Sequence, residues 1–484
     1  MTSDVAGGGR SFRDPENAAY HHDGIWYRIA GPSSAQALLT LRESPLYEQL
    51  LAEGVLEPFD AVDRADVLAA YRQVDLRPDV PDVRVFRTTT REPITYPWEW
   101  PNSLLAAAGR LTAQLRVRLL SIGLDVKDAS ALNVQFIGTR PVFLDLGSIE
   151  QWRPNPGWNA ARQFIEHYIN PLAVGSAGPM NSAAAWELGQ RRGLRSDVAR
   201  AVQPRAQSRN IRLSLLQASA RPVAGKAPTE TTYAQAARAN PDLARRATLG
   251  LTRRLAEQVD RLDRSRGQVK STWEDYGSRE HYASADLGRK EAFASEFIVR
   301  GERGQLVLDI GGNDGMTARA LCRSGAQRVI VADSDAGALR QLLANLEGTP
   351  EAARITPLIV DVTNATTGSG LLGVEFEAFT SRVRPSAVIC QAVLHHIVIT
   401  QGVPLPLAVE ALAAFGAPVQ IEFADETDEK VRILLSQIPN WTGAYSMTEL
   451  IRSLERQYSH VDVVGKTSAS RHVVNAWGLR GTGR

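Results

Sequence analysis

The stretch LVLDIGGNDGMTARAL, Leu306 to Leu321, places a glycine-rich turn between a buried strand and a helix. The apolar run LVLDI is typical of a strand, and MTARAL begins a helical pattern. Because Gly311, Gly312 and Gly315 have no side chains, a ligand can approach the backbone of this turn closely. Such a ligand is expected outside the carboxyl ends of the strands, where open parallel sheets bind cofactors.

The surrounding sequence extends this pattern into a sheet. From Trp273 onward, strand and helix patterns alternate regularly. Near-continuous apolar strands separated by helices favour a parallel sheet that is covered on both faces. The predicted strands are LVLDI, RVIVAD, TPLIVD, SAVICQ and PVQIEF, and a C-terminal hairpin around HVDVV and HVVNAWG is expected to join them.

Acidic residues end two of these strands. Asp333 ends the second strand, where a carboxylate can hold both hydroxyls of a ribose, and Asp361 ends the third, where it can accept from an adenine amino group. This arrangement, together with the glycine turn, resembles the class I S-adenosylmethionine-dependent methyltransferases. The resemblance implies an α/β fold with a Rossmann-like seven-stranded sheet and a terminal antiparallel hairpin. It also implies S-adenosylmethionine (SAM) as the cofactor, bound by Asp309, Gly311, Gly312, Asp314, Gly315, Asp333, Ser334, Asp361, Val362 and Gln391.

A dinucleotide-dependent dehydrogenase is the rival interpretation of this half. The dinucleotide fingerprint requires G-x-G-x-x-G, from which GGNDG departs. Asp309 and Asp314 near the turn also suit a cationic sulfonium ligand better than a pyrophosphate. These residues favour the methyltransferase.

The resemblance extends to a bacterial subfamily with an N-terminal kinase-like domain, found in polysaccharide, nodulation-type and natural-product contexts. The stretches that carry it are STWEDYG, YASADLGRKEAF, AVLHHIVITQGVPLPLAVEAL and IEFADETDEKV, with SFRDPENA, ITYPWEW and VKDASALNVQF at the front. It implies O-methylation of a sugar, polysaccharide or natural product, so the expected partner is a small-molecule or glycan acceptor. Gln391 departs from the family, since many members carry Asp or Asn there, and this leaves the chemistry of the acceptor open.

Methyl transfer to oxygen usually requires a base that removes the proton of the acceptor. His395 and His396 follow the fourth strand, at the edge where the methyl group should emerge, and an ordinary histidine pKa near 6.5 suits a base at neutral pH. One of the pair can equally pack or cap the following helix. Glu422 at the end of the fifth strand is a second acid/base candidate, with a structural ion pair as its alternative role. No metal cluster is evident in the sequence.

The N-terminal half contains a second motif, VKDASALNVQFIGTRPVFLDLGS, from Val126 to Ser148. Asp128, Asn133 and Asp145 have the separations at which kinases orient the attacking hydroxyl and hold magnesium. No convincing phosphate loop or strand lysine precedes them, although Arg28 could replace that lysine with Glu48 as its partner. We therefore expect a kinase-like fold whose possible nucleotide site is vestigial, and Mg-ATP binding stays an open alternative.

Composition limits the remaining possibilities. A formal net charge of +2 gives no reason to expect nucleic acid or an anionic membrane as partner, and no apolar run is long enough for membrane insertion. The N-terminus has no signal-peptide pattern, and the two cysteines suit a reducing compartment. We therefore expect a cytoplasmic enzyme.

Three domains are expected, and three functions compete. The predicted domains are a kinase-like domain at 11–174, a helical and partly flexible linker at 175–267, and a methyltransferase domain at 268–484. The leading function is SAM-dependent O-methylation. The alternatives are a bifunctional Mg-ATP-dependent kinase/methyltransferase and a SAM-binding scaffold without turnover. The sequence contains no signal for the oligomeric state.

Overall fold

The computed structural model describes residues 14–74, 80–89, 92–154, 157–176, 180–219, 237–264, 284–438 and 441–481. The chain forms two compact units that divide between Val269 and Lys270, except that 92–94 and 137–140 group with the second unit. The motif STWEDYG and the segment 220–236 of the expected linker lie outside the described residues. The three predicted domains stay a prediction.

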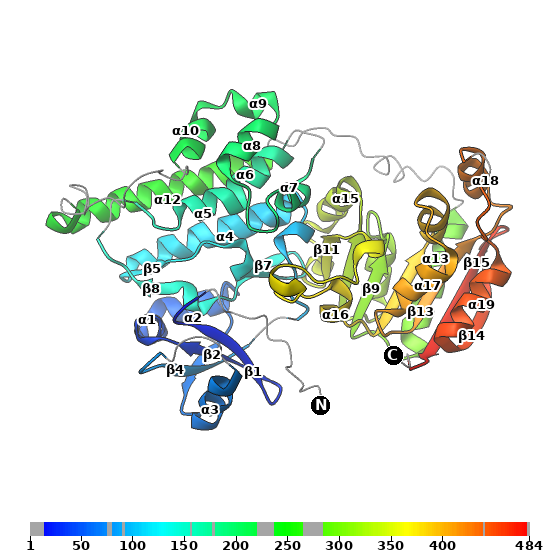
Figure 1. Cartoon of the computed structure of the whole chain (residues 1–484), viewed down its shortest axis with the longest axis horizontal. Helices are drawn as coiled ribbons and strands as arrows, with labels where there is room; N and C mark the ends of the chain where they lie inside the picture. Colours follow the sequence, from blue (N-terminus) through cyan, green and yellow to red (C-terminus); the bar gives the residue numbers. More distant parts are fainter. Residues whose placement is uncertain are drawn as a thin grey trace. The chain divides into compact units, whose positions relative to one another are not determined.

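The second unit is built on a seven-stranded sheet in the order β11-β10-β9-β12-β13-β15-β14 (Figure 1). Strands β9 to β13 are parallel, whereas β15 is antiparallel to both β13 and β14. The strands are β9 (Leu306–Ile310), β10 (Arg328–Asp333), β11 (Ile355–Ile359), β12 (Ala387–Gln391), β13 (Val419–Ala424), β14 (Tyr458–Ser468) and β15 (Arg471–Leu479). This order confirms the seven-stranded sheet with a terminal antiparallel hairpin.

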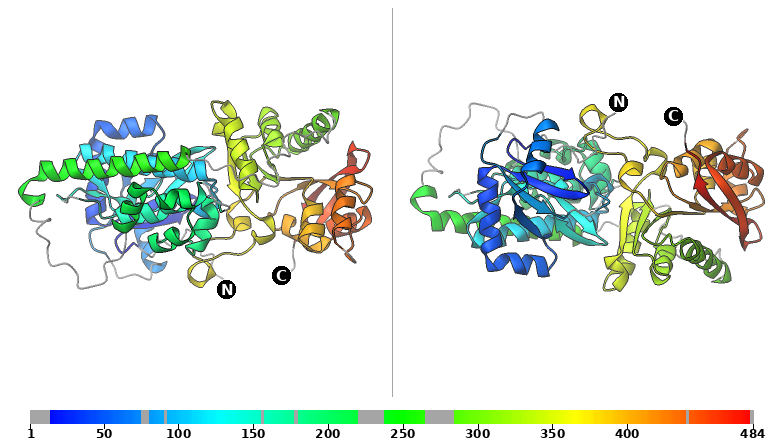
Figure 2. Two further views of the ribbon diagram at one scale, coloured as in Figure 1. Left: turned by 90° about the horizontal axis from the view of Figure 1, so that it is seen from above. Right: turned by 90° about the horizontal axis from the view of Figure 1, so that it is seen from below.

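Helices cover both faces of this sheet, as Figure 2 shows for the second unit. All five residues of β9 are buried, which requires cover on both sides. One face packs against α13, α14 and α15 through an apolar core that includes Phe297, Leu321 and Leu342. The helical elements are α13 (Ser284–Arg300), α14 (Met316–Arg323), α15 (Ala336–Leu346), η6 (Pro350–Ala353), η7 (Val362–Asn364), η8 (Leu371–Gly373), α16 (Phe379–Arg382), η9 (His396–Thr400), α17 (Leu405–Ala413), α18 (Glu429–Ser436) and α19 (Met447–Gln457).

The strand order places a switch point between β9 and β12. From β9 the chain proceeds outward through β10 and β11, and it then returns to β12 on the other side of β9. At such a reversal the connecting loops diverge and leave a crevice at the carboxyl ends of the strands. The glycine turn follows β9 and therefore lies at this crevice.

The first unit begins with a four-stranded antiparallel sheet in the order β1-β2-β4-β3. Tyr27 and Ile29 of β2 pack with Val67 of the helix that follows β3, and these residues belong to the apolar core beside this sheet. The elements are β1 (Ala18–His22), β2 (Ile25–Ala30), α1 (Pro32–Glu43), α2 (Pro45–Ala52), β3 (Phe59–Val62), α3 (Ala65–Val74) and β4 (Arg84–Thr88). The sequence patterns agree with these elements, since β2 and β4 are rich in β-branched and aromatic residues and α2 ends before Gly54.

A larger helical part follows, centred on the predicted amphipathic helix α4 (Asn102–Ser121). The long helix α12 (Pro241–Arg264) packs on α4, where buried Arg116 contacts Asp125 at 2.6 Å and also Thr252 of α12. The other elements are η1 (Pro97–Glu99), β5 (Leu124–Val126), η2 (Ala131–Asn133), β6 (Val134–Ile137), β7 (Arg140–Phe143), η3 (Leu146–Ser148), β8 (Ile149–Gln151), α5 (Ala161–Phe164), η4 (Ile165–Ile169), α6 (Asn170–Gly175), α7 (Ser182–Leu188), α8 (Ser196–Val202), α9 (Arg205–Ser208) and α10 (Ile211–Ser219). Strands β6 and β7 pair in a two-stranded sheet and form a hairpin between Asn133 and Asp145.

Among the described residues, no helix combines the length and apolarity that crossing a bilayer requires.

Candidate functional site

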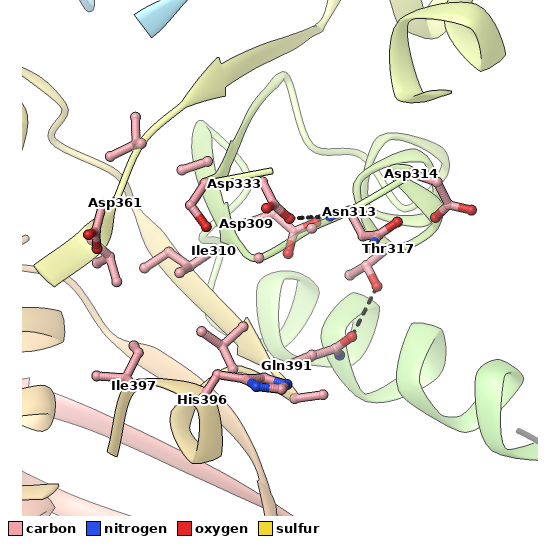
Figure 3. A pocket seen from close by; sticks show the side chains of 18 of the residues that line it. Asp309, Ile310, Asn313, Asp314, Thr317, Asp333, Asp361, Gln391, His396 and Ile397 are labelled. Carbon is pink, nitrogen blue, oxygen red and sulfur yellow. Dashed lines mark hydrogen bonds between the residues drawn. The ribbon is translucent and has the colours of Figure 1, made fainter. Parts of the chain in front are cut away.

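A cavity of about 300 Å³ opens at the carboxyl ends of β9, β10, β11 and β12, at the switch point of the sheet (Figure 3). Its wall combines the glycine turn with strand-end acids and with residues from α13 and η9. The lining residues are Leu287, Lys290, Asp309, Ile310, Gly311, Gly312, Asn313, Asp314, Met316, Thr317, Ala332, Asp333, Ser334, Val360, Asp361, Val362, Gln391, Ala392, Val393, His396, Ile397, Thr400 and Gln401. Nine of the ten cofactor residues expected from the sequence are in this set, and Gly315 is the exception.

The glycines of the turn leave no room for side chains. Gly311 has a φ of 67°, and a Cβ there would lie 2.3 Å from Cγ2 of Val393. A Cβ on Gly312 would lie 2.5 Å from the Oδ2 atom of Asp309. Gly315 has a φ of 78° and begins α14. Because only glycine fits these positions, bare backbone forms this side of the cavity.

Asp333 lies at the end of β10 with its carboxylate fixed from two sides. Its Oδ2 accepts from the backbone N–H of Asn313 at 3.0 Å, and its Oδ1 accepts from that of Asp335 at 2.8 Å. Burial raises the pKa of Asp333 to about 6 despite these hydrogen bonds, so the group is mostly ionised at pH 7. A charged acceptor is thus held in place at the cavity wall.

Asp361 differs from Asp333 because it is exposed and because its side chain accepts hydrogen bonds from its own loop. Its Oδ1 accepts from the backbone N–H of Thr363 at 2.9 Å and from the Thr363 hydroxyl at 2.6 Å. This contact makes Asp361 the cap of the short turn η7, in which Val362 is buried. The exposed Ser334 follows Asp333 at the neighbouring strand end.

Asp309 is the most deeply buried acid of the cavity. Asp309 is 1% exposed, and its Oδ2 has no hydrogen-bond partner among the described residues. Burial, and then the negative charges of Asp333 and Asp314, raise the pKa of Asp309 to about 8. Figure 3 shows Asp309 beside the hydrogen-bonded pair of Asp333 and Asn313.

Gln391, the departure from the family pattern, connects three elements. Its Oε1 accepts from the Thr317 hydroxyl of α14 at 3.0 Å, and its Nε2 donates to the backbone carbonyl of Lys290 in α13 at 3.2 Å. Asp in this position would lose the donated bond. The side chain therefore ties β12 to both helices at the floor of the cavity.

The two histidines have different environments. His396 lines the cavity, whereas His395 is 1% exposed and does not. Their rings lie 4.2 Å apart, at the start of the π-helical turn η9. Burial, and then the charges of Arg471 and Lys430, lower the pKa of His396 to about 4, so it is neutral at pH 7. Of the two, only His396 is placed to meet a ligand in this cavity.

Glu422 lies on β13 and is 1% exposed. Lys290 Nζ lies 2.7 Å from its Oε2, and the Thr467 hydroxyl donates to its Oε1. Glu422 does not line the cavity, so its structural role, the ion pair with Lys290, is the one that the geometry supports. Lys290 itself lines the cavity and was not expected from the sequence, since a single lysine in an amphipathic helix is usually solvated.

The three kinase-like residues of the first unit lie in one hydrogen-bonded cluster. Asn133 Nδ2 donates to the Asp128 carbonyl and to the Ser148 hydroxyl, both at 2.9 Å, and Ser148 donates to Asp145. Arg28 Nη1 lies 3.0 Å from Asp145 Oδ1. Burial, and then the charge of Asp145, raise the pKa of Asp128.

The expectation that Glu48 would be the partner of Arg28 was wrong. Arg28 pairs with Asp145, whereas Glu48 lies on an exposed position of α2. The long reach of arginine and the acidic site beside β2 explain the difference.

Among the described residues of the chain, no group of three or more His, Cys, Asp or Glu side chains could hold a metal ion.

Comparison with known proteins gives one curated relative and several solved structures. No family model matches the chain. The nodulation protein NoeA of Rhizobium meliloti (strain 1021) is 28% identical over 429 residues, which cover 88% of this chain and 86% of NoeA.

Two solved structures illustrate the structural comparison. Magnesium protoporphyrin IX methyltransferase ChlM of Synechocystis PCC 6803, with bound SAM, is 16% identical over 44% of this chain and 86% of its own, with a TM-score of 0.29. The bifunctional kinase-methyltransferase WbdD is 17% identical over 44% of this chain, with a TM-score of 0.28. The match spans 42% of WbdD, less than half of its length.

The chain resembles the class I SAM-dependent methyltransferases. This resemblance rests on what the chain itself shows, namely the strand order, the glycine turn after β9 and the fixed Asp333 at the end of β10.

Proposed function

We propose that this protein is a SAM-dependent methyltransferase. The observation that carries the proposal is the cavity at the switch point of the sheet, walled by bare glycine backbone and by Asp333. A second observation tests the fit of such a cofactor. The buried Oδ2 of Asp309 has no hydrogen-bond partner in the described part of the chain, which suits a ligand that carries positive charge and donors.

Different residues of the cavity would bind different parts of the cofactor. Asp333 would hold the ribose hydroxyls, because its carboxylate is fixed and mostly ionised at pH 7. Asp361 and Val362 would receive the adenine, and the backbone of Gly311 and Gly312 would receive the amino-acid end. When bound, SAM supplies a methyl group on a sulfonium for in-line displacement.

His396 would act as the base in O-methylation. It lies in the cavity wall and is neutral at pH 7, so its ring can accept the proton that an acceptor hydroxyl loses. A pKa of about 4 makes it a weak base, which suits an acceptor that is positioned well or is itself acidic. Thr400 and Gln401 of the same wall offer further polar groups toward an acceptor.

The acceptor we propose is a hydroxyl or carboxylate of a sugar, polysaccharide or natural product. The resemblance of several motifs to that methyltransferase subfamily supports it, as does the similarity to a protein named for nodulation. We place the enzyme in the cytoplasm, because its two cysteines, Cys322 and Cys390, are buried and unpaired.

We propose that the first unit is kinase-like and serves acceptor recognition rather than phosphoryl transfer. An antiparallel sheet, a long helix and a hairpin between Asn133 and Asp145 support the fold. The ion pair of Arg28 with Asp145 supports the lost activity, since it occupies the carboxylate that would hold magnesium. A bifunctional kinase/methyltransferase is the alternative, favoured by the clustering of Asp128, Asn133 and Asp145.

Replacing Asp145 by Asn separates these two possibilities. We expect the Asn variant to keep methyl transfer within about twofold, because Asp145 acts only within its own cluster. We also expect neither the wild type nor the variant to bind Mg-ATP in calorimetry. Saturable Mg-ATP binding that the variant loses would instead establish a working phosphotransfer site.

The methyltransferase proposal is tested with SAM labelled on its methyl group. The full-length protein is incubated with panels of sugars, glycans, phenols and carboxylates, and S-adenosylhomocysteine and labelled product are measured. We expect stoichiometric formation of both with at least one acceptor. Tight SAM binding without turnover on any of these acceptor classes would favour the non-catalytic scaffold.

A further inference from the structure

Asp309 differs from Asp333 because one oxygen of its buried carboxyl group accepts no hydrogen bond from the described residues. It lies in the centre of the sheet, opposite Val331 of β10 and Ile389 of β12. Its Oδ2 faces the glycine turn, since a Cβ on Gly312 would lie 2.5 Å from this atom. Among the residues that the structure describes, the same oxygen has no hydrogen-bond partner. An ionised carboxylate in such a place is strongly disfavoured.

The charged and titratable groups around Asp309 increase this penalty. Asp333 at the end of β10 and Asp314 in the turn are acids, and their charges repel a second negative charge. Cys390 on β12 remains a neutral thiol, because burial raises its pKa to about 12. Lys290 on α13 has its ammonium 2.7 Å from Glu422. Within the described residues, no Arg, Lys or His side chain forms an ion pair with Asp309.

We propose that Asp309 selects the charge of the cofactor by exchanging a proton for it. In the empty cavity the carboxyl group holds a proton, and binding of a positively charged ligand releases that proton to solvent. The inference rests on the proposed function, since SAM is the cationic ligand that we assign to this cavity. No other bond forms or breaks, so the charge of the site is conserved in the exchange.

The exchange makes Asp309 a specificity-determining residue. A ligand with a positive charge can replace the proton and leave a buried, compensated ion pair. An uncharged adenosine compound cannot replace it, so Asp309 stays protonated and gives no electrostatic gain. An anionic nucleotide would add to the repulsion from Asp333 and Asp314.

Calorimetry in buffers of different ionisation enthalpy measures the exchange directly. The full-length protein is titrated with SAM at pH 7 in phosphate and in Tris, and the difference in heat gives the protons released. We expect about 0.9 proton per bound SAM, the protonated fraction of a group with a pKa of about 8. Methylthioadenosine, which keeps the adenine, ribose and thioether without charge, should bind with no release.

The variant Asp309→Asn provides the matched test, since asparagine copies the shape of the protonated acid. It should bind SAM with less than about 0.2 proton released, whereas Asp462→Asn, at an exposed position of β14 that does not line the cavity, should release as much as the wild type. Equal release by the wild type and Asp309→Asn would overturn the inference, and so would equal release with SAM and methylthioadenosine. Absence of any SAM binding would instead refute the proposed function.

The stability of the ligand-free protein gives a second measurement that needs no cofactor. Asp309 is protonated in the folded chain and ionised in the unfolded chain between pH 4 and 8, so it lowers stability as pH rises through this range. Asp309→Asn should therefore unfold at higher urea concentration than the wild type, by a margin that grows from pH 5 to pH 8. A margin that is the same at both pH values would contradict a buried proton on Asp309.

Discussion

Replacing Asp333 by Ala is expected to weaken SAM binding by roughly 10- to 150-fold. The carboxylate is fixed by two backbone N–H groups and lies in the cavity wall, where it would accept the ribose hydroxyls. Hydrogen bonds to a charged group contribute about 1.5–3 kcal/mol, and about 1.4 kcal/mol corresponds to tenfold. Calorimetric titration with SAM measures the change.

The controls for this prediction address folding and specificity. Asp333→Asn keeps the size of the side chain and should lose less affinity than Asp333→Ala. Asp462→Ala, which removes an exposed acid on β14 away from the cavity, should leave the SAM affinity unchanged. Thermal unfolding shows whether the loss of the bonds to Asn313 and Asp335 disturbs the turn. A folded Asp333→Ala variant with wild-type affinity would contradict the cofactor assignment.

Replacing His396 by Ala is expected to lower the rate of methyl transfer by about 10²–10⁴-fold, the usual contribution of a general base. The affinity for SAM should change by less than about threefold, because the proposed cofactor contacts lie on other strand ends. The rate is measured as S-adenosylhomocysteine formation with the best acceptor of the panel. His460→Ala, at an exposed position of β14, is the matched control and should keep the wild-type rate.

The pH dependence provides a test of the same residue. A base is active when it is deprotonated, so the rate falls as pH drops through its pKa. With the pKa of His396 lowered to about 4, the wild-type rate at saturating SAM should persist from pH 7 to about pH 5, because saturation offsets the protonation of Asp333 near pH 6. A loss of rate centred near pH 6.5 would indicate a histidine with an ordinary pKa. A wild-type rate in His396→Ala would show that another group accepts the proton.

The local pattern of the sequence was sufficient to predict most of the residues that line the cavity on its proposed cofactor side. The turn after β9 needs glycine for steric reasons, and acids at the ends of apolar strands share one edge of a parallel sheet. Both features depend on neighbours in the sequence and on a strand period of two. The sequence therefore predicts that Asp309, Gly311, Gly312 and Asp333 lie together, and all four line the cavity.

The acceptor side depended on contacts between distant segments. Glu422 was expected to end a strand as Asp333 does, but it lies two residues before the end of β13, and its carboxylate forms an ion pair with Lys290 of α13. His395 and His396 are adjacent in sequence, and only the π-helical geometry of η9 determines which of them faces the cavity. Gln391 is tied to Thr317 and to Lys290, which no local pattern reveals.

Calorimetric titration of the full-length protein with SAM tests the central claim most directly. We expect saturable binding of SAM at one site per chain. This binding should be abolished or strongly weakened in Asp333→Ala and retained in Asp462→Ala. Titration with Mg-ATP under the same conditions should give no binding. A folded protein that gives no saturable heat with SAM would contradict the account.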